Sequence, residues 1–143
     1  MIVYVDADGC PVVDIALQLC KKHSITCVLV CDTAHSFSSK NADIITVDKG
    51  SDSVDFAIAN RLSPGDIVIT QDYGLASMCL SRNAIVLHQD GWAYTTDNID
   101  TLLLQRYEAR KLRSSGGRMK GPKKRSNSQN QAFSNALEKL LNG

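Results

Sequence analysis

The chain has 143 residues, of which 43% are hydrophobic and 22% charged, a composition typical of a single soluble domain with its own core. No apolar run approaches the roughly 20 residues that a membrane-spanning helix requires, so we expect no such helix. The five cysteines form no CxxC pair, so we expect reduced, buried thiols in a cytoplasmic protein rather than a zinc site.

The net charge of +1 conceals two segments of opposite sign. Residues 1–105 contain 13 Asp and no Glu against six Lys and Arg, a net charge of −7. Residues 106–125 contain nine Lys and Arg against one Glu, a net charge of +8. An acidic body followed by a basic segment is the distribution expected of a carboxylate site that acts on a polyanion.

The first half of the chain alternates apolar strands with a helical pattern. A strand is predicted over residues 2–6, and Pro11 is suited to the first turn of the helix that follows. A near-continuous apolar run predicts a second strand over 26–31. After a polar loop, residues 43–47 form the third predicted strand.

The alternation continues towards the middle of the chain. A helix capped by Ser51 or Asp52 is predicted to end near Arg61. A strand over 67–70, a helix over 73–81 and a strand over 84–87 follow. This order predicts an α/β fold with a mostly parallel sheet of about five strands and helices on both faces.

The last forty residues differ in composition. A helix is predicted from about Thr96 to Leu112, followed by a glycine-rich basic loop. Ser128 and Gln131 have the spacing of a capping box that begins a final helix. We therefore predict one domain over 1–143, with an acidic α/β body over 1–105 and a basic segment and C-terminal helix over 106–143.

Aspartates follow three of the predicted strands. Because the carboxyl ends of parallel strands meet at one edge of a sheet, these side chains are expected to converge there. Asp52 and Asp72 could instead be plain helix N-caps, and Asp32, which ends the second strand, is a further candidate. Carboxylate oxygens suit Mg²⁺ or Mn²⁺. The candidate metal ligands are Asp6, Asp8, Asp52, Asp55 and Asp72.

Several motifs are absent. The chain has no GxxxxGK[ST] phosphate loop, no GxGxxG and no GxSxG nucleophile elbow. Cys10 stands near a helix start, where the helix dipole favours a thiolate, but a small buried thiol is the simpler interpretation.

Four segments together carry a family resemblance. DADGCPV, GSDSVDFAIA, GDIVITQDYGLA and GGRMKGPKKR resemble the bacterial YaiI/YqxD family, and the resemblance covers nearly the whole chain. That family is grouped with PIN-like domains, which are metal-dependent nucleases. The resemblance therefore implies a three-layer α/β/α fold, a Mg²⁺ or Mn²⁺ ion, and a nucleic-acid substrate, with RNA as the guess from the wider group.

The PIN-type pattern maps onto particular residues. Asp6 matches the Asp that follows the first strand, and Asp55 or Asp52 matches the acidic residue that opens a mid-chain helix. Asp72, in Thr70-Gln71-Asp72, matches the T-x-D pattern at a strand end. Many PIN nucleases carry a further Glu on an early helix, whereas this chain has no Glu before Glu108. That position is absent or replaced by Asp8 or Asp32.

These observations predict a metal-dependent ribonuclease. The catalytic candidates are Asp6, Asp8, Asp55 and Asp72, and Thr70 could hold a water molecule or a phosphate oxygen. The basic segment is expected to contact the phosphate backbone. Its candidate residues are Arg113, Arg118, Lys120, Lys123, Lys124 and Arg125.

Two other functions fit parts of the sequence. Asp6-Ala7-Asp8-Gly9 resembles the DxDG opening of haloacid-dehalogenase-type phosphatases, in which Asp6 would be the nucleophile and Asp8 the acid/base. The third alternative is a non-catalytic nucleic-acid-binding module whose carboxylates hold a structural ion. The sequence leaves the choice between monomer and homodimer open.

Overall fold

The structure is a computed structural model that describes most of the chain. Five short stretches lie outside the described residues, namely 33–36, 38–39, 41, 51–52 and 115–123. Within the described residues, no helix is long and apolar enough to cross a membrane.

A mixed sheet forms the centre of the molecule, with the strand order β3-β2-β1-β4-β5-β6. The first five strands run parallel, and β6 pairs antiparallel with β5. The five predicted strands are therefore confirmed to within one residue at each end. β6 is too short for an alternating pattern to predict. The strands are β1 (Ile2–Asp6), β2 (Thr26–Cys31), β3 (Asp43–Thr46), β4 (Ile67–Ile69), β5 (Ile85–Leu87) and β6 (Ala93–Tyr94).

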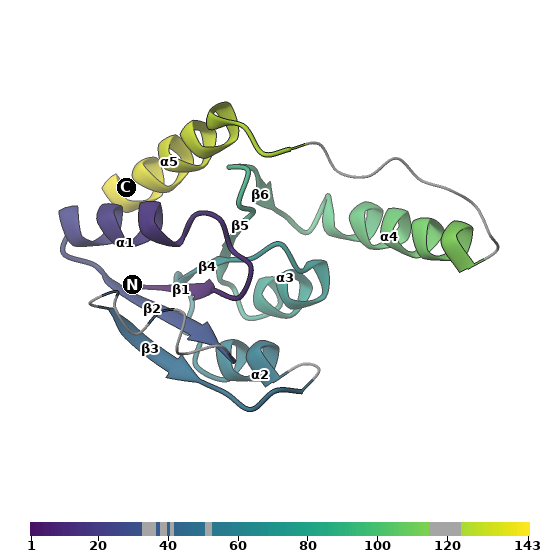
Figure 1. Ribbon diagram of the computed structural model, residues 1–143, viewed down its shortest axis with the longest axis horizontal. Helices are drawn as coiled ribbons and strands as arrows, with labels where there is room; N and C mark the ends of the chain where they lie inside the picture. Colours follow the sequence, from purple (N-terminus) through teal and green to yellow (C-terminus); the bar gives the residue numbers. More distant parts are fainter. Residues whose placement is uncertain (33–36, 38–39, 41, 51–52, 115–123) are drawn as a thin grey trace.

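Helices cover both faces of this sheet. Figure 1 shows α1 and α5 side by side on one face, and α2 and α3 on the other. The fold is thus a three-layer α/β/α arrangement, as the sequence predicts. The longer α4 packs against α3 at its start and then extends away from the body (Figure 1). The helices are α1 (Val13–Lys22), α2 (Ser53–Ala59), α3 (Tyr73–Leu80), α4 (Ile99–Ser114) and α5 (Asn127–Asn142).

The core lies in two clusters, one on each face of the sheet. Alternate residues of β1 point to opposite faces, so Val3 and Val5 belong to the first cluster and Tyr4 to the second. Phe133 and Leu137 of α5 are fully buried in the first cluster. The C-terminal helix is therefore part of the same core as the central strand.

Two helix starts differ from the sequence prediction because other side chains make the caps. α4 begins at Ile99 rather than near Thr96, because Thr95 and Asn98 exchange backbone-to-side-chain hydrogen bonds of 2.9 and 3.1 Å just before it. The predicted capping box at Ser128 and Gln131 is wrong by two residues. The N-cap is Ser126, whose backbone N–H donates to the Gln129 side chain at 2.8 Å.

A third helix start also differs. α1 begins at Val13, and Pro11 lies before it rather than in its first turn. The N-cap of α1 is Val12, which offers no side-chain acceptor. Val12 is instead fully buried in the core, so packing rather than capping fixes the start of this helix.

Candidate active site

The candidate site lies where the strand order changes direction. β1 has β2 on one side and β4 on the other, and the helices that follow β1 and β4 cover opposite faces. In open α/β sheets, ligands bind in the crevice outside the carboxyl ends of such strands. Pairing of Val5 with Ile69 brings the next residues, Asp6 and Thr70, side by side at this edge.

A chain of hydrogen bonds links Asp6, Thr70 and Asp72. The Thr70 hydroxyl donates to Oδ2 of Asp6 at 2.9 Å, and the Asp72 backbone N–H donates to the Thr70 hydroxyl oxygen at 3.0 Å. Thr70 is almost fully buried. The Tyr94 hydroxyl donates to the Thr70 carbonyl at 3.3 Å and so holds this residue from behind. The orientation of the Asp6 carboxylate is therefore fixed by buried neighbours.

Asp72 has two roles. Its Oδ1 accepts hydrogen bonds from the backbone N–H groups of Gly74 and Leu75 at 2.8 and 3.2 Å, so Asp72 is the N-cap of α3. The same oxygen lies 3.7 Å from the guanidinium of Arg106 on α4. Capping fixes the Asp72 carboxylate at the pocket that Asp6 also lines.

The surroundings of the Asp6 carboxyl disfavour its negatively charged form. Its pKa is raised to about 6, first by burial and then by the negative charges of Asp55, Asp72 and Asp8. The Thr70 hydroxyl acts in the opposite direction. A carboxylate with three acidic neighbours and little solvent is stabilised by a bound cation or by a proton. The electrostatics of this edge of the sheet therefore favour cation binding.

A pocket of about 450 Å³ opens directly onto these groups. Its lining includes two carboxylates, a guanidinium group, a side-chain amide and an aromatic ring. Sequence reasoning missed three of these residues, because only the packing of α4 and the turn into α3 bring them to the pocket. The lining residues are Asp6, Gln71, Asp72, Tyr73 and Arg106.

The other described metal-ligand candidates, Asp8 and Asp55, are not among the residues that line this pocket. Asp8 follows β1, and its Oδ2 accepts the backbone N–H of Asp32 at 2.7 Å, which ties the turn after β1 to the end of β2. Asp55 lies in the first turn of α2 and is half-buried. Asp52 lies outside the described residues. Among the described residues, no three His, Cys, Asp or Glu side chains gather closely enough to enclose one metal ion.

The donor set at the pocket nevertheless fits a hard divalent cation. Mg²⁺ is commonly bound through one or two carboxylates, with water and substrate phosphate oxygens as the remaining ligands. Asp6 and Asp72 supply two carboxylates at one pocket, and the pKa of Asp6 is raised by burial and by its acidic neighbours. Two carboxylates that line one open pocket are the arrangement expected for an ion that also contacts its substrate.

The basic segment is only partly described. Arg118, Lys120 and Lys123 lie outside the described residues, and Arg113 and Lys124 are exposed. Arg125 has an unpredicted structural role. Its guanidinium contacts Asp90 at 2.5 Å, the Gln89 carbonyl at 2.6 Å and the Asn130 side chain at 2.7 Å, which ties the start of α5 to the loop after β5.

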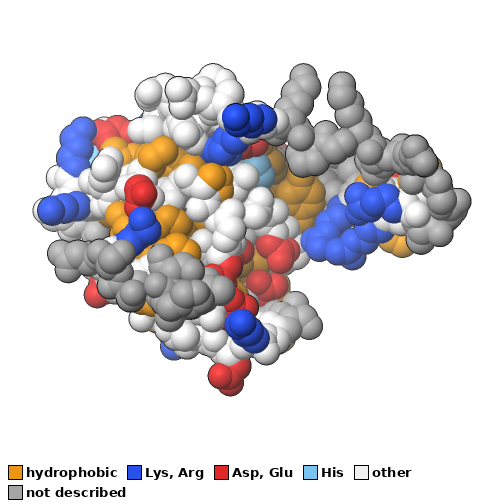
Figure 2. Space-filling model, in the orientation of Figure 1, with side chains coloured by type: hydrophobic (Ala, Val, Ile, Leu, Met, Phe, Trp, Pro, Cys, Tyr) orange, Lys and Arg blue, Asp and Glu red, His pale blue; other side chains and the backbone are white. Residues whose placement is uncertain are grey.

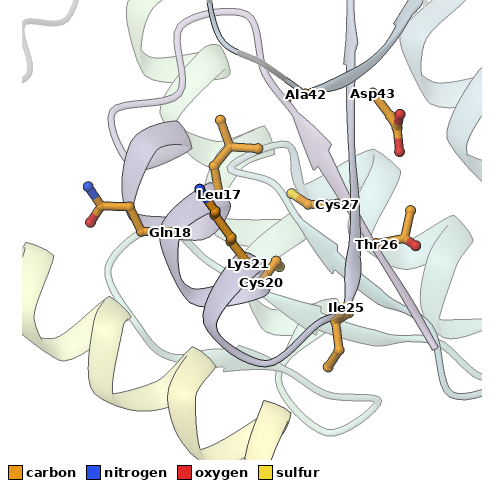
Figure 3. A pocket seen from close by; sticks show the side chains of 9 residues that line it. All are labelled: Leu17, Gln18, Cys20, Lys21, Ile25, Thr26, Cys27, Ala42 and Asp43. Carbon is orange, nitrogen blue, oxygen red and sulfur yellow. The ribbon is translucent and has the colours of Figure 1, made fainter.

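A second pocket, of about 510 Å³, lies at the amino ends of β2 and β3, away from the carboxyl ends that carry Asp6 and Thr70 (Figure 3). It is lined by α1 and by residues at the starts of β2 and β3, and Cys20 and Cys27 both contribute to its lining. All five cysteines are free thiols, as the sequence predicts, and four of them are buried. Cys10 was also expected to be buried, but it is partly exposed. This pocket has a single carboxylate, Asp43, and is unrelated to the acidic edge.

Comparison with known proteins assigns the sequence to a family. A family model described as "Uncharacterized BCR, YaiI/YqxD family" matches residues 4–143. A UPF0178 protein of Exiguobacterium sibiricum is 48% identical, and the match covers 99% of this chain and 96% of the relative. A UPF0178 protein of Clostridium acetobutylicum is 44% identical over 99% of this chain and 97% of the relative. No solved structure matches the chain.

Proposed function

The chain belongs to the YaiI/YqxD family, and we propose that it is a metal-dependent nuclease that hydrolyses phosphodiester bonds at the Asp6 pocket. One observation carries the proposal. The hydrogen-bonded Asp6, Thr70 and Asp72 lie at the switch point of the sheet and line an open pocket together with Arg106. This combination supplies negative charge for a cation and positive charge for a phosphate within one site.

Each residue of the pocket has a role in this proposal. Asp6 and Asp72 hold a Mg²⁺ or Mn²⁺ ion, which when bound supplies charge to stabilise the phosphodiester and makes water a better nucleophile. Thr70 donates a hydrogen bond to Asp6 and so fixes the orientation of its carboxylate. Arg106 neutralises part of the charge on the phosphate, since its guanidinium already lies at the pocket.

Asp8 and Asp55 contribute mainly through charge. Both raise the pKa of Asp6 and therefore strengthen the preference of the site for a cation. RNA as the substrate rests on the resemblance to PIN-like domains and on the +8 charge of residues 106–125.

The phosphatase alternative has less support. In that mechanism Asp8 must transfer a proton to the leaving group beside Asp6. In the structure an Asp8 oxygen accepts the Asp32 backbone N–H at 2.7 Å, and Asp8 is not among the residues that line the pocket. A phosphoryl group trapped on Asp6 would favour the phosphatase over the nuclease.

The test is cleavage of a single-stranded RNA oligonucleotide in the presence of Mn²⁺. We expect Asp6→Asn and Asp72→Asn to lower the rate by at least about 100-fold, or about 2.7 kcal/mol in the barrier. Asn remains a good N-cap, so Asp72→Asn leaves α3 intact. Asp97→Asn, in an exposed turn, is the matched control for the loss of one carboxylate and should cleave like wild type.

The outcomes separate the alternatives. Equal cleavage by wild type, Asp6→Asn and Asp72→Asn would exclude these carboxylates as the source of activity. Salt-sensitive RNA binding without any metal-dependent turnover would instead favour a non-catalytic binding module.

A further inference from the structure

One face of α4 continues from the candidate site as a row of arginines. Arg106, Arg110 and Arg113 are spaced four and three residues apart, which places them on the same side of the helix. At about 1.5 Å per residue, they rise about 6 Å and then about 4.5 Å along the helix axis. We call these three residues the arginine face.

The packing of α4 fixes the direction of this face. Ile99 is buried, and Leu102 and Leu103 pack against the core cluster next to α3, which anchors the first half of the helix. On the same side, Arg106 lies at the pocket, 3.7 Å from Asp72. Arg110 and Arg113 follow where α4 leaves the body, and both are exposed.

The surface charges agree with this placement. Figure 2 shows Lys and Arg side chains gathered along α4, next to a patch of Asp and Glu side chains on the body. The acidic patch attracts cations, whereas the neighbouring helix attracts anions. A ligand that contacts both the acidic patch and α4 must carry repeated negative charges along α4. At the acidic patch it must bind through a shared cation.

We propose that the arginine face is a binding track for the phosphates of a single-stranded nucleic acid, leading into the Asp6 pocket. This inference rests on the proposed nuclease function for the identity of the bond that is cut. Arg106 binds the phosphate at the pocket, and Arg110 and Arg113 bind successive phosphates further along the strand. Arg106 and Arg110 are thereby added to Arg113, the one residue of this face that the sequence alone indicated.

The shape of the site favours a single strand over a duplex. Asp6 is only partly exposed and lines a pocket of about 450 Å³, a volume that suits a small ligand. A flexible strand can place one phosphate in such a pocket while its neighbours lie along α4. A rigid duplex keeps its backbone on the outside of a wide cylinder and cannot direct one phosphate inwards without bending.

The test is equilibrium binding of a fluorescent 12-nucleotide oligouridylate, measured by anisotropy in EDTA so that no cleavage occurs. Each phosphate contact on a single strand contributes about 0.7 to the slope of log K against log salt. Replacing all three arginines by Gln should therefore reduce the slope by about 2. Between 50 and 200 mM salt, wild type should lose about 16-fold more affinity than this variant.

Two further variants keep the result interpretable. The double variant Arg110→Gln/Arg113→Gln leaves the pocket untouched and should reduce the slope by about 1.4. A control that removes three exposed cations elsewhere, at Lys21, Arg82 and Lys139, should keep the wild-type slope. An unlabelled duplex of the same length should compete at least tenfold more weakly than the single strand.

Three results would overturn the inference. They are an unchanged slope in the triple arginine variant, an equal loss in the control variant, and equal competition by the duplex. Failure of the nuclease proposal gives a different pattern, namely arginine-dependent binding of the single strand without Mn²⁺-dependent cleavage by wild type.

Discussion

Keeping Asp6 ionised in the folded protein is energetically unfavourable, and its neighbours do not offset this cost. Burial and three nearby carboxylates raise its pKa to about 6, above the roughly 3.9 of an unfolded chain. The folded state therefore binds this proton more tightly than the unfolded state does. The favourable contribution to stability is complete below about pH 4 and is lost as the pH rises through about 6.

This sign predicts a pH-dependent effect of Asp6→Asn on stability. At pH 8 the substitution removes an unfavourable buried charge, so we expect the free energy of unfolding to rise by roughly 2 kcal/mol. At pH 4 the wild-type carboxyl is protonated in the folded protein, and the difference should shrink towards zero. Urea denaturation at the two pH values measures this difference.

The control for this prediction is Asp97→Asn, which removes a carboxylate from an exposed position. It should change the free energy of unfolding by less than about 0.5 kcal/mol at both pH values. A gain from Asp6→Asn that is the same at pH 4 and pH 8 would contradict the assignment of the effect to charge.

At the residue scale, the sequence predicted the carboxylates better than their partners. Asp6 and Asp72 could be placed at one edge because strand ends are readable from apolar runs, and parallel strands align their ends. Arg106 could not be placed, because its position depends on how α4 packs against α3. Arg125 was expected at a nucleic-acid surface, whereas its three contacts within the protein arise from the tertiary position of α5.

At the scale of elements, α5 approaches the turn between β5 and β6 closely. Gly91 in that turn has a φ of +94°, and a Cβ there would lie 2.6 Å from the backbone of Ala132 and 2.8 Å from that of Phe133. Glycine is therefore required twice at this position, for its backbone conformation and for the space that it leaves to the helix.

Substitution of Gly91 should separate these two requirements. Gly65 has a similar φ of +89° but no atom within 4 Å of an added Cβ. Gly65→Ala should cost about 1 kcal/mol from backbone strain alone. Gly91→Ala should cost about 1–3 kcal/mol more, because α5 must shift. Equal losses in thermal or urea denaturation would show that α5 does not press on this turn.

The starts of the helices were the part that the sequence predicted least well, whereas the ends of the five predicted strands were right to within one residue. Apolar periodicity located each main strand and helix, but the starts of α4 and α5 depend on which of several neighbouring Ser, Thr and Asn side chains makes the cap. Ser126 and Ser128 both have an acceptor-bearing residue three positions later, so spacing alone does not choose between them. The backbone leading into the helix decides, and that is a tertiary property.

At the scale of the whole molecule, the C-terminal helix belongs to the central core. Phe133 and Leu137 are fully buried with residues of β1 and α1. Phe133→Ala should therefore lower the free energy of unfolding by about 3–5 kcal/mol. The matched change Phe56→Ala removes a side chain that is 56% exposed and should cost less than about 0.5 kcal/mol.

Urea denaturation of the wild-type protein tests whether the molecule unfolds as one unit. Trp92 is the one tryptophan of the chain and reports on the turn before β6, whereas far-UV circular dichroism reports on all the helices. The two transitions should coincide in urea. A separate, earlier loss of helix signal would contradict a shared core.

The central claim is that Asp6 and Asp72 together bind a divalent cation, and a crystal structure with Mn²⁺ tests it most directly. We predict an anomalous-scattering peak within about 2.0–2.6 Å of a carboxylate oxygen of both residues, and its loss in Asp6→Asn crystals. Wild-type crystals saturated with Mn²⁺ that show no peak between these two carboxylates would contradict the claim.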